Sequence, residues 1–166
     1  MTNKLEHLTM TELADIVRTL AANSEPSHAY RTIDAVLEKY VGYKLLTVLV
    51  CIVAERSVER TYSSNEALYP IGGRKKNLDS AWGRIVVDAA QPLISRNDRD
   101  IEAIFADFET LRGLGISGMI NIPVIANGVV IGSLNISGEA GQFSEADIPV
   151  LTVLANLLAP ALTQYQ

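Results

Sequence analysis

Residues 117–137 read SGMINIPVIANGVVIGSLNIS, with Asn127-Gly128 near the middle of the stretch. An Asn-Gly pair accepts the positive φ angles of a two-residue type I′ turn, and the segments on both sides are rich in Val and Ile. The stretch therefore predicts a β-hairpin with strands at residues 117–126 and 129–137. It is the strongest local signal in the chain, and the rest of the fold can be built outward from it.

The register of this hairpin follows from its turn. If pairing runs outward one residue at a time from a two-residue turn, Asn121 lies opposite Leu134 and Ile120 lies opposite Asn135. Each face then mixes apolar residues with small polar ones, and a buried amide must find a hydrogen-bond partner. Asn121, or Ser133 together with Asn135, is a candidate for lining a ligand cavity. The alternative is that these side chains bond only to their neighbours in the sheet.

The segments before the hairpin add more strands. Residues 45–54 (LLTVLVCIVA) are apolar on both alternating faces, which predicts a central strand covered on both sides. A more polar strand is expected at residues 58–63, followed by a long loop at residues 65–77. Beyond this loop we expect a short helix that carries Trp82 and a short strand at residues 92–96.

Helices are expected at both ends of the chain and in its middle. Apolar residues at helical spacing predict amphipathic helices over residues 9–22 and 26–42. Asp98 can cap an internal helix that continues through Phe108. A last helix is expected to begin at Ser144 with a capping box to Asp147 and to run to about Thr163, with Pro160 kinking or ending it.

This order of elements predicts one α+β domain over residues 1–166. Its economical arrangement is an antiparallel sheet with the terminal helices on one face and the internal helices and loops on the other.

Three segments resemble the GAF family of ligand-sensing domains. They are the apolar strand LLTVLVCIVA, the hairpin MINIPVIANGVVIGSLNIS and the terminal FSEADIPVLTVLANLLAPAL. More narrowly, YSSNEALYPIGGRKK followed by AWGRIV is similar to a group of small stand-alone bacterial GAF proteins. The resemblance implies a six-stranded antiparallel sheet, a pocket between the sheet and the internal helices, and a homodimer formed through terminal helices, including residues 1–24.

Two known ligands of GAF domains are not expected here. The N-K-F-D-E motif of cyclic-nucleotide-binding members is absent, and the internal helical region has no cysteine for attaching a bilin. No cofactor is therefore expected. The ligand implied by the resemblance is an unidentified small molecule.

Two aromatic residues are candidates for the pocket. Trp82 is the only tryptophan and lies on the helix expected to cover the pocket; the alternative is that it belongs to the core. Tyr62 ends the second strand and is a candidate for the pocket rim, with sheet packing as its alternative.

Cationic residues are candidates for holding an anionic ligand. Arg74 and Lys75 follow Gly72-Gly73, whose backbone N–H groups can converge on a carboxylate or phosphate. Arg96 and Arg112 flank the second internal helix. All four are equally compatible with solvated or ion-paired surface positions. The acidic residues of that helix are expected on its solvated outer face: Asp98, Asp100, Glu102 and Asp107.

The composition limits the classes of binding partner and the cellular compartment that we expect for this protein. The net charge of -5 leaves no excess of cations for a nucleic-acid backbone. Cys51 is the only cysteine, so no intramolecular disulfide or thiolate metal site is expected. No signal-peptide core and no apolar run of about 18 residues is present, which indicates a cytoplasmic protein that does not span a membrane.

Three functions remain open at this stage. The leading hypothesis is a non-catalytic sensor that binds a small molecule and acts through a dimer mate or a separate output protein. The second is a GAF-type free methionine sulfoxide reductase, which would need a resolving thiol beside Cys51. The third is a purely structural dimerisation module, suggested by the wide apolar surface of the last helix.

Overall fold

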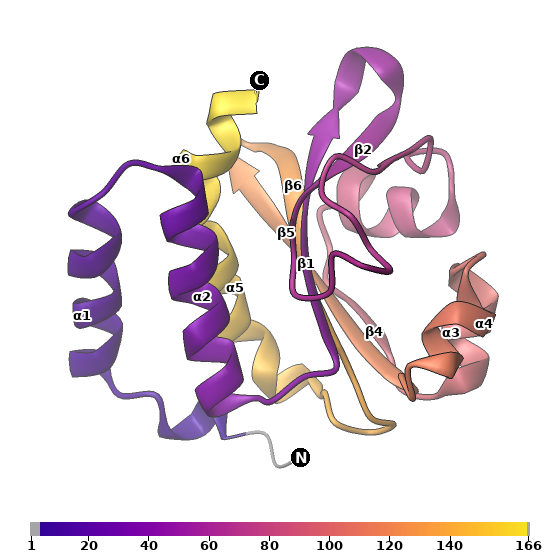
Figure 1. Cartoon of the computed structure of the whole chain (residues 1–166), viewed down its shortest axis with the longest axis horizontal. Coiled ribbons are helices and arrows are strands. Elements are labelled where there is room, and N and C mark those ends of the chain that lie inside the picture. The colour runs from indigo at the N-terminus through magenta and orange to yellow at the C-terminus, as the bar shows by residue number, and fades with distance from the viewer. Residues whose placement is uncertain (1–3, 166) are drawn as a thin grey trace.

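The computed structural model describes residues 4–165 and has three layers (Figure 1). Its longer helices and its strands are α1 (Met10–Ala21), α2 (Pro26–Tyr40), β1 (Leu45–Ile52), β2 (Ser57–Ser63), β3 (Arg74–Lys75), β4 (Leu93–Ser95), α3 (Asp98–Ile104), α4 (Phe108–Gly113), β5 (Gly118–Ala126), β6 (Val129–Gly138), α5 (Ile148–Asn156) and α6 (Ala159–Leu162). Short 3-10 helices and one π-helix complete it: Leu5–His7, Val53–Glu55, Gly83–Asp88 (π), Glu145–Asp147 and Thr163–Tyr165.

The six strands form one antiparallel sheet in the order β3-β2-β1-β6-β5-β4. β1, apolar on both faces, is central as expected. In Figure 1, α1, α2, α5 and α6 lie on one side of the sheet and α3 and α4 on the other. The predicted α+β architecture is therefore confirmed.

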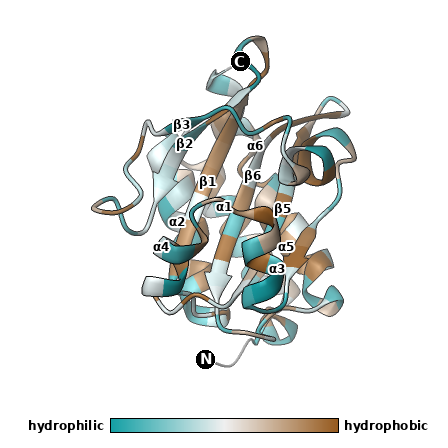
Figure 2. Cartoon of the chain, turned by 90° about the vertical axis from the view of Figure 1, so that its right-hand side faces the viewer, coloured by the Kyte–Doolittle hydropathy of each residue, from teal (hydrophilic) through white to brown (hydrophobic). Residues whose placement is uncertain are grey.

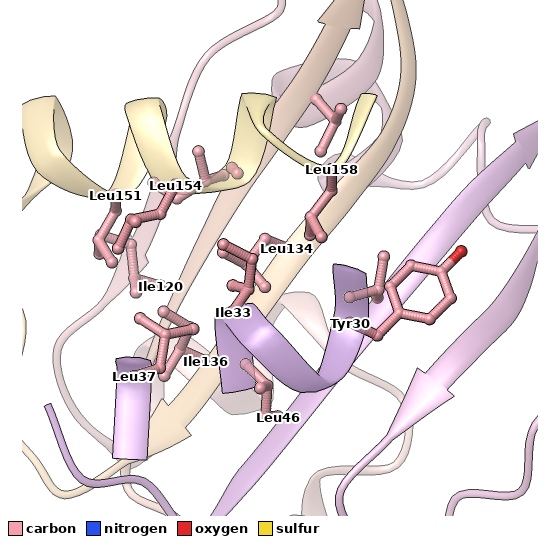
Figure 3. Packing of buried hydrophobic residues seen from close by; sticks show 14 of the residues in the cluster. Tyr30, Ile33, Leu37, Leu46, Ile120, Leu134, Ile136, Leu151, Leu154 and Leu158 are labelled. Atoms are coloured by element: carbon pink, nitrogen blue, oxygen red, sulfur yellow. The ribbon is translucent and has the colours of Figure 1, made fainter. Parts of the chain in front are cut away.

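The main core lies between the sheet and the terminal helices. α2 contributes Ile33 and Leu37, α5 contributes Leu151 and Leu154, and these leucines are fully buried against Leu134 of the sheet. Figure 3 shows these side chains converging from the two helices onto the strands. Each buried leucine or isoleucine contributes roughly 1.5–3 kcal/mol of hydrophobic stabilisation, so this interface dominates the stability of the domain.

Capping residues set where the terminal helices start. Thr9 and Glu12 form a capping box at α1, and Pro26 occupies the first turn of α2, where a missing N–H costs nothing. The predicted capping box of Ser144 and Asp147 is present as well, at the start of the 3-10 turn that leads into α5.

The predicted last helix is interrupted. α5 ends at Asn156 and α6 begins at Ala159, because Pro160 has no N–H for the carbonyl four residues earlier. Within residues 4–165 no single helix is long and apolar enough to cross a membrane; only the pair Glu145–Asn156 and Ala159–Tyr165, bent by 48°, reaches the required length and composition together.

Two β-bulges displace the registers expected from regular strands. In the hairpin, Ala126 pairs with Val129 as predicted, but Ile131 is an extra residue on β6. Beyond this bulge Asn121 lies opposite Asn135, so the predicted pairs Asn121–Leu134 and Ile120–Asn135 are wrong by one residue. The second bulge, at Thr61 of β2, lies where the pairing changes between Val48 and Leu49 of β1. A bulge inserts one unpaired residue and turns every later side chain to the opposite face.

The internal helices differ in detail from the prediction. Asn97, not Asp98, caps α3, since its side-chain oxygen accepts hydrogen bonds from the N–H groups of Arg99 and Asp100. The helix does not continue through Phe108; it ends at Ile104, and α4 starts at Phe108.

Candidate functional site

A cavity of about 80 Å³ lies between the sheet and the segments that cover its second face. Figure 2 shows the side of the molecule on which α3 and α4 lie in front of the strands. The lining residues come from β1, β2, β5, β6, the segment from Tyr69 to Trp82, and the region of α3 and α4. They are Leu45, Thr47, Leu49, Val58, Arg60, Tyr69, Gly73, Lys75, Asn77, Trp82, Phe105, Asp107, Leu111, Met119, Asn121, Asn135 and Ser137.

A row of polar side chains crosses the floor of the cavity. Asn135 lies opposite both Thr47 of β1 and Asn121 of β5. The Nδ2 of Asn121 donates to Asn135 Oδ1 (2.8 Å), and the Nδ2 of Asn135 donates to Thr47 Oγ1 (3.3 Å). The bulge at Ile131 creates this row, because the regular register would have placed the two asparagines on opposite faces.

Arg60 is the least expected residue of the site. It lies on β2 opposite Leu49, and only 8% of its surface is exposed. Its Nη1 donates to the carbonyl oxygen of Pro70 (2.9 Å), and its guanidinium lies 5.1 Å from the centre of the Tyr69 ring. Burial lowers the pKa of this guanidinium from its usual value. An arginine at this depth binds acceptors more strongly than a solvated one, since water competes less.

Asp107 links the two segments that cover the cavity. Its carboxylate accepts a hydrogen bond from the Tyr69 hydroxyl (2.9 Å) and lies 3.5 Å from Lys75 Nζ. Burial, and then the charge of Asp107, raise the pKa of the Tyr69 hydroxyl. The prediction that Asp107 lies on a solvated helical face is therefore wrong: it lies in the break between α3 and α4 and lines the cavity.

Four of the predicted site residues line the cavity and a fifth lies on the same face. Trp82, Lys75, Asn121 and Asn135 are among the lining residues. Trp82 is also part of a buried cluster with Val86, so it both belongs to the core and lines the cavity. Ser133 lies opposite Leu49 on the cavity side of the sheet, but it is fully buried and does not line the cavity.

Tyr62 does not lie at the pocket. The bulge at Thr61 pairs Tyr62 with Val48, so its ring points to the face covered by the terminal helices. There it packs near Tyr30, and its hydroxyl donates to Asp34 of α2. The prediction failed because a bulge reverses the alternation of side chains.

Three predicted cationic residues also lie outside the cavity lining. Arg74 is exposed and pairs with Glu55 and Glu59, and Arg96 is exposed and pairs with Glu145. Arg112 is exposed on α4. Long cationic side chains remain in water unless a buried acceptor compensates for the lost hydration, and a solvated ion pair is the common outcome.

The Gly72-Gly73 pair does not offer converging donors. The N–H of Gly72 donates to the carbonyl of Arg60 (2.7 Å), and that of Gly73 donates to the carbonyl of Pro70 (3.4 Å). The role of the glycines is steric instead. A Cβ on Gly73 would lie 2.8 Å from Arg60 Nη1, so the missing side chain makes room for the guanidinium.

Sequence reasoning missed Arg60, Tyr69 and Asp107. The sequence contained one indication that Arg60 is buried. Arg60 lies two residues after Val58 in a strand expected next to the central strand, so the two side chains share one face of the sheet. Tyr69 and Asp107 carried no such signal, since both lie in irregular segments whose path depends on tertiary contacts.

Redox and metal chemistry have little support among the described residues. Cys51 is 2% exposed, burial raises the pKa of its thiol to about 11, and it does not line the cavity. No group of three or more His, Cys, Asp or Glu side chains within residues 4–165 is arranged to hold a metal ion.

The comparison with protein families agrees with the fold expected from the sequence. The family model described as GAF domain matches residues 11–163. The chain belongs to the GAF domain family. The sequence has no significant match among curated proteins.

Solved structures of other GAF domains share this fold. The GAF domain of a phosphoenolpyruvate-protein phosphotransferase from Coxiella burnetii is 18% identical, with a TM-score of 0.73 over 92% of this chain and 90% of that one. The nlh2 GAF domain of A. Aeolicus, in an inactive state, is 18% identical, with a TM-score of 0.72 over 98% and 100%. The free methionine-R-sulfoxide reductase of Neisseria meningitidis, solved with its substrate, is 17% identical, with a TM-score of 0.70 over 93% and 89%. At these identities the similarity establishes the fold alone.

Proposed function

We propose that this GAF domain is a non-catalytic sensor that binds a small molecule in the cavity beside Arg60. The observation that carries the proposal is the composition of the cavity lining. It combines apolar walls with a small set of inward polar groups, as small-molecule sites generally do. Burying a guanidinium and two asparagine side chains lowers the stability of the fold. Binding a ligand through these groups is a function that explains why they are buried there.

A ligand bound in this cavity would change the contacts between the segments that cover it. Asp107 joins Tyr69 and Lys75 across the cavity, so a ligand beside Arg60 alters the charges that hold these segments together. Similar solved structures include the GAF domain of a two-component sensor histidine kinase and a segment of a methyl-accepting chemotaxis protein. By analogy, the signal here is passed to a dimer mate or to a separate output protein.

Screening metabolites by thermal shift tests the proposal. A ligand present at 100 times its dissociation constant stabilises the folded state by about 2.7 kcal/mol. For a domain of this size, that corresponds to a rise in Tm of roughly 5–11 °C. Native mass spectrometry of the purified protein tests it independently. If no compound shifts Tm and no molecule copurifies, the cavity is not a ligand site.

The reductase alternative makes a distinct prediction. Structural similarity to a free methionine-R-sulfoxide reductase motivates it, but that chemistry needs a reactive thiol and a resolving partner. Cys51 is buried behind the cavity lining in a cluster with Val58 and Trp82, and its raised pKa keeps it protonated at neutral pH. We therefore expect no thiol-dependent turnover of free methionine sulfoxide. Turnover that disappears in Cys51→Ser would overturn this expectation.

Dimerisation through the terminal helices is the second part of the proposal. A groove between the end of α1, the start of α2 and the C-terminal helices is lined partly by Leu20, Leu157 and Pro160. Val17, which also lines the groove, is 45% exposed, and Val153 of α5 is 44% exposed. A second copy that covers this surface gives an isologous dimer. Light scattering tests it: a mass near 18.0 kDa at micromolar concentration rejects the dimer.

A further inference from the structure

The charge of the cavity is not balanced. Its lining includes two cationic side chains, Arg60 and Lys75, and one carboxylate, Asp107. Lys75 lies 3.5 Å from that carboxylate, which also accepts the Tyr69 hydroxyl. Among residues 4–165, no carboxylate oxygen lies within ion-pair distance of the Arg60 guanidinium. The cavity of a protein with a net charge of -5 thus has one uncompensated positive charge.

Arg60 also has unused hydrogen-bonding capacity. The guanidinium has five N–H donors. Nη1 donates to the carbonyl of Pro70, and Nε is buried with no partner in the described part of the chain. An unpaired buried donor is costly, and the cost is higher for a charged group. An acceptor with negative charge satisfies both the donor and the charge.

At the other side of the cavity floor the unused group is an acceptor. Asn121 is 1% exposed, and its Nδ2 donates to Asn135. Its Oδ1 is buried without a partner among the described residues. The neighbouring Asn135 directs its Nδ2 to Thr47 and accepts from Asn121 through its Oδ1. A hydroxyl or N–H group on a ligand would satisfy this oxygen.

Apolar side chains, together with Thr47 and Asn135, line the space between these two groups. Arg60 is on β2 and Asn121 on β5, three strands apart in the sheet order. At the usual spacing their backbones are about 14 Å apart, so a ligand that reaches both is longer than a simple anion. Leu49, Phe105 and Trp82 are among the apolar side chains that line the cavity.

We infer that the ligand is an elongated monocarboxylic acid with an apolar body and a hydroxyl or N–H donor at the end away from the carboxylate. The carboxylate binds Arg60, and the distal donor binds Asn121 Oδ1. The inference rests on the proposed function, because it specifies the chemistry of the same cavity.

The test uses one probe and three analogues of it. 4-Hydroxyphenylacetate has the acid and the donor, phenylacetate lacks the donor, 2-(4-hydroxyphenyl)ethanol lacks the charge, and tyrosine adds an ammonium group on one further carbon. Calorimetry gives the affinities of the full-length protein. Trp82, the only tryptophan, lines the cavity, so its fluorescence reports whether each probe binds there. We expect the first probe to bind more tightly than each of the others by about tenfold or more.

Matched variants separate the two contacts. Arg60→Met is expected to weaken the acids by about tenfold to a hundredfold and to leave the neutral alcohol unchanged. Asn121→Leu is expected to abolish the preference for 4-hydroxyphenylacetate over phenylacetate. Arg74→Met removes the same charge from an exposed residue outside the cavity and is expected to change nothing. If Arg60→Met does not fold, Arg60→Lys keeps the charge while removing the Nε donor, and a smaller loss for the acids is expected.

The outcomes distinguish this inference from the proposed function. If the neutral alcohol or tyrosine binds best, or if Arg60→Met leaves the acids unaffected, the cavity is a ligand site but the ligand class is wrong. A neutral molecule found bound to the purified protein leads to the same conclusion. If no probe binds and nothing copurifies, the inference and the proposed function fail together.

Discussion

Gly132 is a residue at which a single added methyl group would meet the backbone of the central strand. It lies on β6 opposite Val50 of β1, next to the bulge at Ile131. A Cβ at this position would lie 2.2 Å from the carbonyl oxygen of Leu49 and 2.8 Å from Leu162 Cδ1. The side chain of Leu162 can rotate, but the carbonyl oxygen is part of the central strand. In Gly132→Ala, β6 and β1 must therefore separate by about 1 Å to restore ordinary contact.

The cost follows from this displacement. Hydrogen bonds of about 2.9 Å between the two strands would lengthen to roughly 3.9 Å, beyond bonding distance. The loss of two such bonds costs about 2 kcal/mol, and overpacking a filled core adds 1–3 kcal/mol. We expect Gly132→Ala to lower the free energy of unfolding by about 3–5 kcal/mol and Tm by roughly 10 °C.

Urea denaturation of paired variants measures this effect. Gly113→Ala is the control, because a Cβ at the end of α4 meets no atom within 4 Å. Alanine is favoured over glycine in a helix by about 0.5–1 kcal/mol, so this variant should be as stable as wild type or slightly more so. The reasoning is refuted if the free energy of unfolding of Gly132→Ala lies within about 1 kcal/mol of the wild-type value, which is the usual resolution of the method, and the m-value is unchanged. An unchanged m-value would indicate an unchanged native state.

Three further predictions concern single side chains. Without ligand, the free energy of unfolding of Arg60→Met should lie within about 1 kcal/mol of the wild-type value, because the lost bond to Pro70 is offset by the removal of a buried unpaired donor. A decrease of more than about 3 kcal/mol in urea denaturation would contradict this. Burial raises the pKa of Cys51 to about 11, so the unfolded thiol ionises first and stability falls as the pH rises above 9.0. Between pH 9 and 11 the free energy of unfolding of the wild type should fall by roughly 2–3 kcal/mol, a loss that Cys51→Ala does not show when denaturation is measured at each pH. Hydrogen bonds, the strongest from Tyr40, lower the pKa of Glu12 to about 2, so its stabilisation is complete above pH 4.5 and is lost as the pH falls toward 2. Urea unfolding of Glu12→Gln should show a weaker dependence on pH in this acid range, and an unchanged acid profile would count against the role of Glu12.

The elements with strong local patterns were predicted well. Asn127-Gly128 gave the hairpin, residues 45–54 gave the central strand, and the Ser144–Asp147 box gave the start of the last helical segment. Each of these depends on interactions between residues close in the sequence, so the pattern of residue types is sufficient. Asn121 and Asn135 were candidates from a hairpin register that proved wrong by one residue, Trp82 from the helix expected to cover the pocket, and Lys75 from the run after Gly72-Gly73.

The remaining site residues depended on interactions that no local pattern contains. Bulges at Thr61 and Ile131 arise from the fit between strands that meet only in the folded sheet. They place Tyr62 under the terminal helices and bring the two asparagines together. Asp107 reaches the cavity because the internal helix breaks before Phe108.

The sequence by itself determined the family, the order of the elements and the apolar faces that form the core, because hydrophobic periodicity and turn chemistry act over a few residues. Only the tertiary structure decided which polar groups share the cavity. A shift of one residue in register reverses a side chain, and burying Arg60 requires acceptors from segments distant in the chain.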